Sequence, residues 1–211
     1  PEIDGLRALA IIFVIFYHAK FDIFKSGYFG VDIFFFISGY LITNIICENF
    51  YNKKFSLINF WERRARRIFP ALFFVIFFIL PICWVILYPK DFREFGQSII
   101  AIIFFLSNVF FYNKTNYFDT AADLKPLLHT WSLSVEGQFY LFYPIILIFL
   151  LKKSEKITKI FLIVVLFINI IFSHLESFDN PQKNFYFING RLWEILLGCV
   201  AAVYHKNNIS I

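Results

Sequence analysis

Apolar runs of close to twenty residues recur along the chain, and they constrain its fold more than any other feature. About 20 apolar residues in a helix span the roughly 30 Å hydrocarbon layer of a membrane. The chain is also 59% hydrophobic and only 17% charged, whereas a soluble domain carries about 25% charged residues. The sequence therefore predicts an all-α fold, a polytopic transmembrane helical bundle.

The apolar runs indicate about seven membrane segments. We expect them at residues 6–24, 28–47, 68–88, 98–111, 131–151, 160–172 and 187–204. The fourth segment has only fourteen residues, which is about 21 Å of helix at 1.5 Å per residue and short for a span.

Basic residues cluster in the two loops at 48–67 and 152–159. An excess of Lys and Arg indicates the cytoplasmic side of a membrane, yet an odd number of segments separates these loops. The topology is consistent if segment 98–111 is re-entrant, with residues 112–130 outside; the alternative is a full span and a basic outer loop. The net charge of +5 follows from these membrane-flanking clusters, so it does not indicate nucleic-acid binding.

Arg7 and His18 are the first ionisable residues of interest. They are eleven residues apart, so both project from nearly the same helical face, about 16 Å apart along the axis. If Arg7 lies at one edge of the hydrocarbon layer, His18 lies near its middle, where an ionisable group should face a bundle interior or a wet cavity. His18 is therefore a candidate catalytic residue, and the alternative is a neutral core histidine bonded to a carbonyl.

Arg64 and Arg67 stand three residues apart at the head of the segment expected from residue 68. Such a spacing places both guanidinium groups on one helical face. Two guanidinium groups beside helix N-terminal amides suit the phosphates of a cofactor. The alternative is that any cytoplasmic loop attracts arginines.

Glu136, Tyr140 and Tyr143 recur with helical spacing and share a face. A carboxylate inside an apolar helix indicates a functional site, although an intramembrane ion pair, for example with Arg191, is the alternative. His129 and Trp131 precede this face, and both could instead be interface anchors.

Three further charged residues lie inside apolar segments. Asp32 either caps a helix within the bundle or orients His18 through a hydrogen bond, and both readings stay open. Arg191 and Glu194 are three residues apart and are expected to pair with each other. The cysteines have no metal-ligand spacing, so no metal is expected.

Five stretches, in order along the chain, resemble motifs of the acyltransferase-3 family of integral membrane acyltransferases, which includes bacterial O-antigen and other glycan O-acetylases. They are residues 4–7 with His18, 30–40 (GVDIFFFISGY), 60–70, 128–144 (LHTWSLSVEGQFYLFYP) and 190–194 (GRLWE). The family domain has about ten membrane helices, so this resemblance implies a single domain over 1–211, expected to be truncated at its C-terminus. The family often has a second acidic residue where Gly137 stands, which leaves Glu136 as the candidate carboxylate.

The resemblance implies transfer of an acyl group, usually acetyl, from cytoplasmic acyl-CoA to a hydroxyl group of an extracytoplasmic or lipid-linked saccharide, such as the lipopolysaccharide O-antigen. The implied location is the bacterial inner membrane, with membrane lipid and a saccharide as partners. The site residues are expected in three groups: catalytic His18, Glu136 and Asp32; acetyl-CoA-binding Arg7, Arg64 and Arg67; and substrate-binding His129, Trp131 and Tyr140.

His18 would act as the general base on the acceptor hydroxyl or as a transient acyl carrier, since imidazole suits either role. A glycolipid transporter or flippase is the alternative function, because buried charges also line substrate paths. The sequence shows no symmetry between two halves of the kind expected for inverted repeats.

Overall fold

The computed structural model describes residues 2–114 and 125–205, and this part of the chain contains helices and short connections. The helices are α1 (Glu2–His18), α2 (Phe29–Tyr51), α3 (Leu57–Ile86), α4 (Pro89–Ile103), α5 (Ser107–Lys114), α6 (Trp131–Lys153), α7 (Glu155–Asp179), α8 (Pro181–Tyr186) and α9 (Ile188–His205), with 3-10 turns η1 (Asp22–Phe24) and η2 (Leu128–Thr130). The predicted all-α bundle is confirmed.

Within the described residues, four helical stretches are long and apolar enough to cross a membrane. They are Phe29–Tyr51, Leu57–Ile86, Leu128–Lys153 and Glu155–Asp179. Many large apolar side chains on these helices are exposed, for example Phe77, Trp84 and Phe167, as expected where hydrocarbon replaces water. The chain is therefore a membrane protein.

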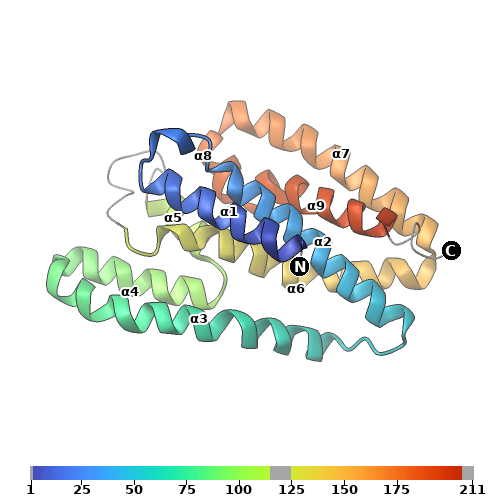
Figure 1. Cartoon of the computed structure of the whole chain (residues 1–211), viewed down its shortest axis with the longest axis horizontal. Coiled ribbons are helices and arrows are strands. Elements are labelled where there is room, and N and C mark those ends of the chain that lie inside the picture. Colours follow the sequence, from blue (N-terminus) through green and yellow to red (C-terminus); the bar gives the residue numbers. More distant parts are fainter. Residues whose placement is uncertain (1, 115–124, 206–211) are drawn as a thin grey trace.

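The long helices run along one common axis (Figure 1). The α2–α3 and α6–α7 connections lie together at one end, which we call the basic end because Lys53, Lys54, Lys152 and Lys153 are there. The connections from α1 to α2, from α3 to α4 and from α7 to α8 lie at the other end, called the distal end. Helix α6 is central and contacts α2, α3, α5, α7, α8 and α9.

The segment predicted at 98–111 is two helices, α4 and α5, rather than one. The break between them contains Phe105, whose φ of 54° is left-handed, and it lies against α6, where Gln138 Nε2 donates to the Phe105 carbonyl at 2.8 Å. Helix α5 then returns to the distal end, where Gln182 of α8 donates to the carbonyl of Tyr112 at 3.1 Å. This part of the chain therefore enters and leaves at the distal end, which is the path that the charged loops predict.

Three other predicted segments have wrong boundaries. Helix α7 begins at Glu155 and ends at Asp179, beyond both ends of the predicted segment 160–172. Helix α1 ends at His18 instead of continuing to Phe24. Helix α3 begins at Leu57, eleven residues before the predicted start, because Ser56 caps it by accepting from the backbone N–H of Asn59 at 3.4 Å. The predicted start follows the long apolar run that comes after the charged residues at 62–67, and it misses the mainly apolar first turn at 57–60 that precedes them.

Helices α2 and α9 make the closest crossing in the core. A Cβ atom at Gly39 of α2 would meet the carbonyl oxygen of Ile195, and one at Gly198 of α9 would meet that of Phe36. Glycine is therefore required at both positions, since the two backbones touch. This crossing fixes α9 beside α2 and brings its charged residues to the first turns of α2.

Candidate active site

A cavity of about 370 Å³ lies between α1, α2, α3 and α6. Its wall is mainly apolar, and its polar residues are Arg7, Ser38, Arg64, Arg67, Thr130, Glu136 and Tyr140. The cavity follows α6 from Tyr140 to Leu133 and continues past Thr130 to Leu127. A mainly apolar cavity with a few convergent polar groups is the usual form of a ligand site.

Three arginines from two helices converge on this cavity. The guanidinium carbon of Arg7 lies 5.4 Å from the centre of the Phe34 ring. Arg64 lies 5.9 Å from the ring of Tyr140, and its Nε is buried without a hydrogen-bond partner in the described part of the chain. With Arg67, these residues bring three positive charges to a cavity wall with one carboxyl group, so the site favours an anion.

The sequence predicts that these three arginines bind acyl-CoA. One premise of that prediction, that Arg64 and Arg67 lie beside the N-terminal amides of a helix, is wrong. Arg64 and Arg67 lie in the second and third turns of α3 and not beside its N-terminal amides. An anion in this cavity would therefore meet guanidinium groups and not helix N-terminal amides, and guanidinium groups can form bidentate hydrogen bonds to phosphate.

Glu136 is the carboxyl group of the cavity and is only 5% exposed. The hydroxyl group of Ser38 on α2 donates a hydrogen bond to its Oε1. Arg7 and Arg67 are close enough to interact electrostatically with it. The alternative of an ion pair with Arg191 is wrong, because Arg191 belongs to a different cluster of charges.

Tyr140 and Tyr143 share the face of Glu136, as the spacing predicts. Tyr140 lines the cavity, and its carbonyl accepts from Trp61 Nε1 of α3 at 3.1 Å. Tyr143 instead shares a hydrogen bond with Thr43 of α2, at 2.7 Å between the two hydroxyl oxygens. Two polar contacts, at Ser38 and Thr43, therefore join this face of α6 to α2.

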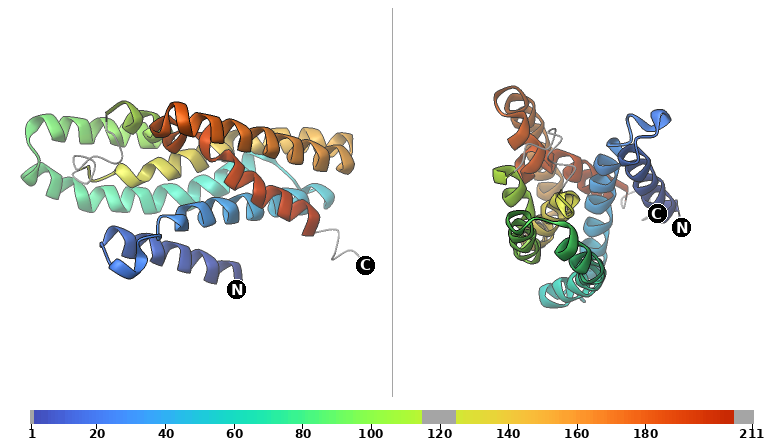
Figure 2. Two further views of the ribbon diagram at one scale, coloured as in Figure 1. Left: turned by 90° about the horizontal axis from the view of Figure 1, so that it is seen from above. Right: turned by 90° about the vertical axis from the view of Figure 1, so that its left-hand side faces the viewer.

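The places of Arg7 and His18 in the bundle differ from the expectation that His18 faces the interior. Arg7 lies in the cavity beside Glu136, whereas His18 is exposed at the end of α1. The spacing of the two residues fixes their separation but not the position of α1 along the bundle. That position is set by packing of α1 against the start of α2 and the turn before it (Figure 2). A Cβ atom at Gly30 would meet the backbone of Ala10, and one at Gly27 that of Phe13.

His18 and His129 lie side by side, with 4.2 Å between their ring centres. His129 is in η2 and immediately precedes Thr130, which lines the cavity. The pair therefore lies beside the end of the cavity that is nearer the distal end, which we call the mouth. The sequence names both histidines but gives no reason to join them.

Lys125 holds the stretch leading to η2 against α4. Its Nζ donates to Glu94 Oε2 at 3.1 Å and to the carbonyl of Lys114 at 3.2 Å. The hydrogen bond from Lys125 keeps the pKa of Glu94 below its ordinary value, because it favours the ionised carboxylate. This pair thereby supports the position of His129 at the mouth.

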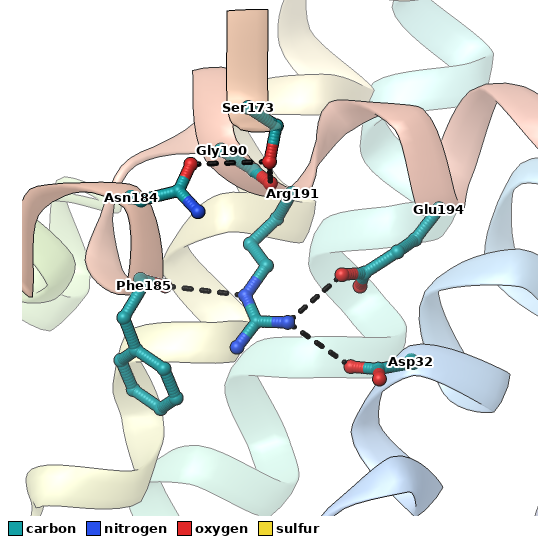
Figure 3. A network of polar contacts seen from close by, with 7 residues as sticks. All are labelled: Asp32, Ser173, Asn184, Phe185, Gly190, Arg191 and Glu194. Atoms are coloured by element: carbon teal, nitrogen blue, oxygen red, sulfur yellow. Dashed lines mark hydrogen bonds and ion pairs between the residues drawn. The ribbon is translucent and has the colours of Figure 1, made fainter. Parts of the chain in front are cut away.

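Asp32 belongs to a second cluster of charges, outside the cavity (Figure 3). Arg191 Nη1 lies 3.2 Å from Asp32 Oδ1 and 2.8 Å from Glu194 Oε1, and Arg191 Nε donates to the Phe185 carbonyl at 3.4 Å. The predicted pair of Arg191 with Glu194 is confirmed. Asp32 was predicted either to cap a helix or to orient His18. The structure supports neither alternative, since it pairs this carboxylate with Arg191.

Trp131 is a core residue rather than part of the cavity wall. It is 3% exposed and its ring centre lies 4.5 Å from that of Phe185 and 6.2 Å from that of Phe35. The guanidinium carbon of Arg191 lies 5.7 Å from its ring centre. Trp131 thus packs the charged cluster against the start of α6.

A family model described as an acyltransferase domain matches residues 1–210. The chain belongs to the acyltransferase-3 family. One similar curated member is the putative peptidoglycan O-acetyltransferase YrhL of Bacillus subtilis, which is 35% identical over 96% of this chain and 33% of its own length. Another is the O-acetyltransferase OatA of Staphylococcus aureus, which is 37% identical over 96% of this chain and 34% of its own length. The peptidoglycan O-acetyltransferase OatA of Listeria monocytogenes is 38% identical over 100% of this chain and 35% of its own length.

The chain thus spans about a third of the length of these acyltransferase-3 relatives. No solved structure matches it. The resemblance inferred from the five motifs is confirmed by the family match.

Packing explains why this acyltransferase-3 chain has glycine after Glu136. The ring of Phe105 lies where a Cβ atom at Gly137 would be, so a second acidic side chain does not fit there. The sequence gives no sign of this contact, because the partner lies in the break between α4 and α5. Ser38 stands in the quoted stretch 30–40, but its place in a Phe-rich helix gives no periodic signal that would single it out.

Proposed function

We propose that this chain provides the cavity of a membrane O-acetyltransferase, which transfers an acetyl group from acyl-CoA to a hydroxyl group of peptidoglycan or its lipid-linked precursor. The observation that carries the proposal is the convergence of Arg7, Arg64 and Arg67 on a cavity with one carboxyl group, Glu136. Family membership supports the reaction type, and the names of the relatives support the acceptor over the O-antigen.

The arginines would bind the phosphates of the donor. Arg67 lies ten residues into α3, about 15 Å from its start at the basic end. A donor entering from that end meets the guanidinium groups before Glu136. We therefore place the basic end on the cytoplasmic side of the bacterial inner membrane, in agreement with the bias of Lys and Arg toward that side.

The acceptor would enter at the mouth, beside His18 and His129. A neutral imidazole has one donor and one acceptor nitrogen, so the two rings together can orient saccharide hydroxyl groups. The transporter alternative has no comparable support, because the relatives are named for acetyl transfer.

The test uses the full-length protein in membrane vesicles with labelled acetyl-CoA and a peptidoglycan acceptor. We expect label to enter the peptidoglycan. Movement of a glycolipid without dependence on acetyl-CoA, and with no labelled saccharide, would favour the transporter.

Arg67→Gln is expected to raise the KM for acetyl-CoA by about 10- to 100-fold, since a hydrogen bond to a charged group contributes about 1.5–3 kcal/mol. The measurement is initial-rate kinetics in the same vesicles. Arg63→Gln is the matched control, because Arg63 is exposed on the same helix and is not part of the cavity wall. Equal effects of the two changes would mean that α3 attracts the donor only by its overall charge.

His18→Ala is expected to lower acetyl transfer by about 100-fold, because misplacing a reacting group by about 1 Å can cost that much in rate. The KM for acetyl-CoA should stay unchanged, because His18 lies at the mouth and the arginines lie in the cavity. Mass spectrometry of the peptidoglycan, at equal protein levels in the membrane, measures the acetyl content. Undiminished acetylation would remove His18 from the mechanism.

A further inference from the structure

The hydrogen bond between Ser38 and Glu136 is the feature of the cavity that donor and acceptor binding leave unexplained. Ser38 comes from α2 and Glu136 from α6, and each is only 5% exposed. Both side chains line the cavity, so the hydroxyl group reaches the space in which a substrate would lie. A serine hydroxyl within hydrogen-bond reach of a carboxylate is the arrangement of a nucleophile and its general base.

The positive charges beside this pair suit the same chemistry. Arg7 and Arg67 line the cavity with Ser38, and the buried Nε of Arg64 has no hydrogen-bond partner in the described residues. When a hydroxyl oxygen attacks a thioester, negative charge develops on the carbonyl oxygen, and fixed donors in an apolar site stabilise it strongly. The cavity therefore offers a nucleophile, a base and oxyanion donors together.

The size of the cavity points to a reaction in two steps. At about 370 Å³ it is near the lower end of the range for a single small-molecule ligand, about 300–1,000 Å³. Because this volume suits one such ligand, the donor from the basic end and the acceptor from the mouth would occupy it in turn. If the donor must leave before the acceptor enters, the acetyl group has to remain on the protein in between.

We propose that Ser38 holds the acetyl group as an ester between the two half-reactions, with Glu136 as its general base; this rests on the proposed function. In the first step Ser38 Oγ attacks the thioester carbonyl carbon and its proton passes to Glu136. The carbon–sulfur bond then breaks, and the departing thiolate takes that proton to leave as the thiol.

The second step returns the site to its starting state. A saccharide hydroxyl that enters past Thr130 attacks the carbonyl carbon of the serine ester, and its proton passes to Glu136. The bond to Ser38 Oγ breaks and this oxygen takes the proton back. His18 and His129 orient the saccharide at the mouth.

The experiment incubates the full-length protein in vesicles with labelled acetyl-CoA, without acceptor, and measures label that stays on the denatured protein. We expect label on the peptide containing Ser38 by mass spectrometry. Ser38→Ala should retain no label there and should lower transfer to peptidoglycan by at least about 100-fold. Ser38→Cys should retain label as a thioester, which neutral hydroxylamine cleaves, whereas the serine ester resists it.

Ser98→Ala is the matched control, because Ser98 is also buried, at 3% exposed, and its hydroxyl group donates to the Phe95 carbonyl within α4. It should keep label on Ser38. If Ser38→Ala lowers activity but wild-type protein carries no label on Ser38, the role of this residue is structural and the proposal is wrong.

The outcomes separate this proposal from the proposed function. If wild-type protein and Ser38→Ala acetylate peptidoglycan equally, or if label is retained on His18 in place of Ser38, the acyl-serine is overturned while the transferase stands. If Ser38 is labelled but no label reaches peptidoglycan, the acyl-serine is supported and the proposed acceptor is wrong.

Discussion

Glu136→Gln is expected to lower acetyl transfer by about 10²- to 10⁴-fold, the range for loss of a group that acts as a general acid or base. The amide has the size of the carboxyl group, and its oxygen can still accept the hydrogen bond from Ser38. It cannot take up the proton of an attacking hydroxyl group. The cavity of the variant should therefore keep its shape but lack the group that takes up the proton.

The measurement is the initial rate of label transfer to peptidoglycan, with the amount of protein in the membrane determined for each variant. Glu62→Gln is the control, since Glu62 is exposed on α3 and pairs with Arg66 at 2.7 Å. Glu136→Asp should retain more activity than Glu136→Gln, because it keeps a carboxylate that is displaced by one methylene group. Full transfer by Glu136→Gln would exclude proton transfer at this position.

Arg191→Met is expected to lower the free energy of unfolding by about 3–5 kcal/mol, the usual result when one partner of a buried ion pair is removed. Arg191 is the cation between two carboxyl groups, Asp32 and Glu194 (Figure 3). Glu194 is 2% exposed, so its charge cannot be solvated when the guanidinium group is lost. Titration with SDS in mixed micelles, followed by tryptophan fluorescence, measures the change.

Neutralising the two partners tests this explanation. In the Arg191→Met protein, Asp32→Asn together with Glu194→Gln should restore much of the lost stability, because no unpaired charge is then buried. Arg93→Met on the exposed face of α4 serves as the control and should change stability little. If Arg191→Met unfolds like the wild type, the cluster does not hold α9 to α2.

Several site residues could be named from the sequence because their types are costly inside a membrane. Arg7, Glu136 and Arg191 interrupt apolar helices, and each lies in a polar cluster of the structure. Helical spacing also correctly placed Glu136 and Tyr140 on one face. These conclusions needed only the local periodicity of a helix and the cost of burying charge.

The partners of these residues were predicted less well. Asp32 was a candidate to orient His18 and instead pairs with Arg191, which is 159 positions away in the chain. Trp131 was expected at a substrate and lies in the core. Ser38 lies in a stretch that resembles a family motif, but nothing singled it out within that stretch, since a hydroxyl group in an apolar helix costs little and shows no spacing.

The amino-acid sequence was enough to predict an all-α membrane protein of the acyltransferase-3 family and most of its buried charges, because hydrophobic length and periodicity act within one segment. How far each helix lies along the bundle depends instead on contacts between helices. Contacts of glycine with a neighbouring backbone, such as Gly30 with Ala10, set these positions. They placed Arg7 beside Glu136 and moved His18 to the mouth beside His129, since the offset between two helices depends on packing between residues distant in the chain.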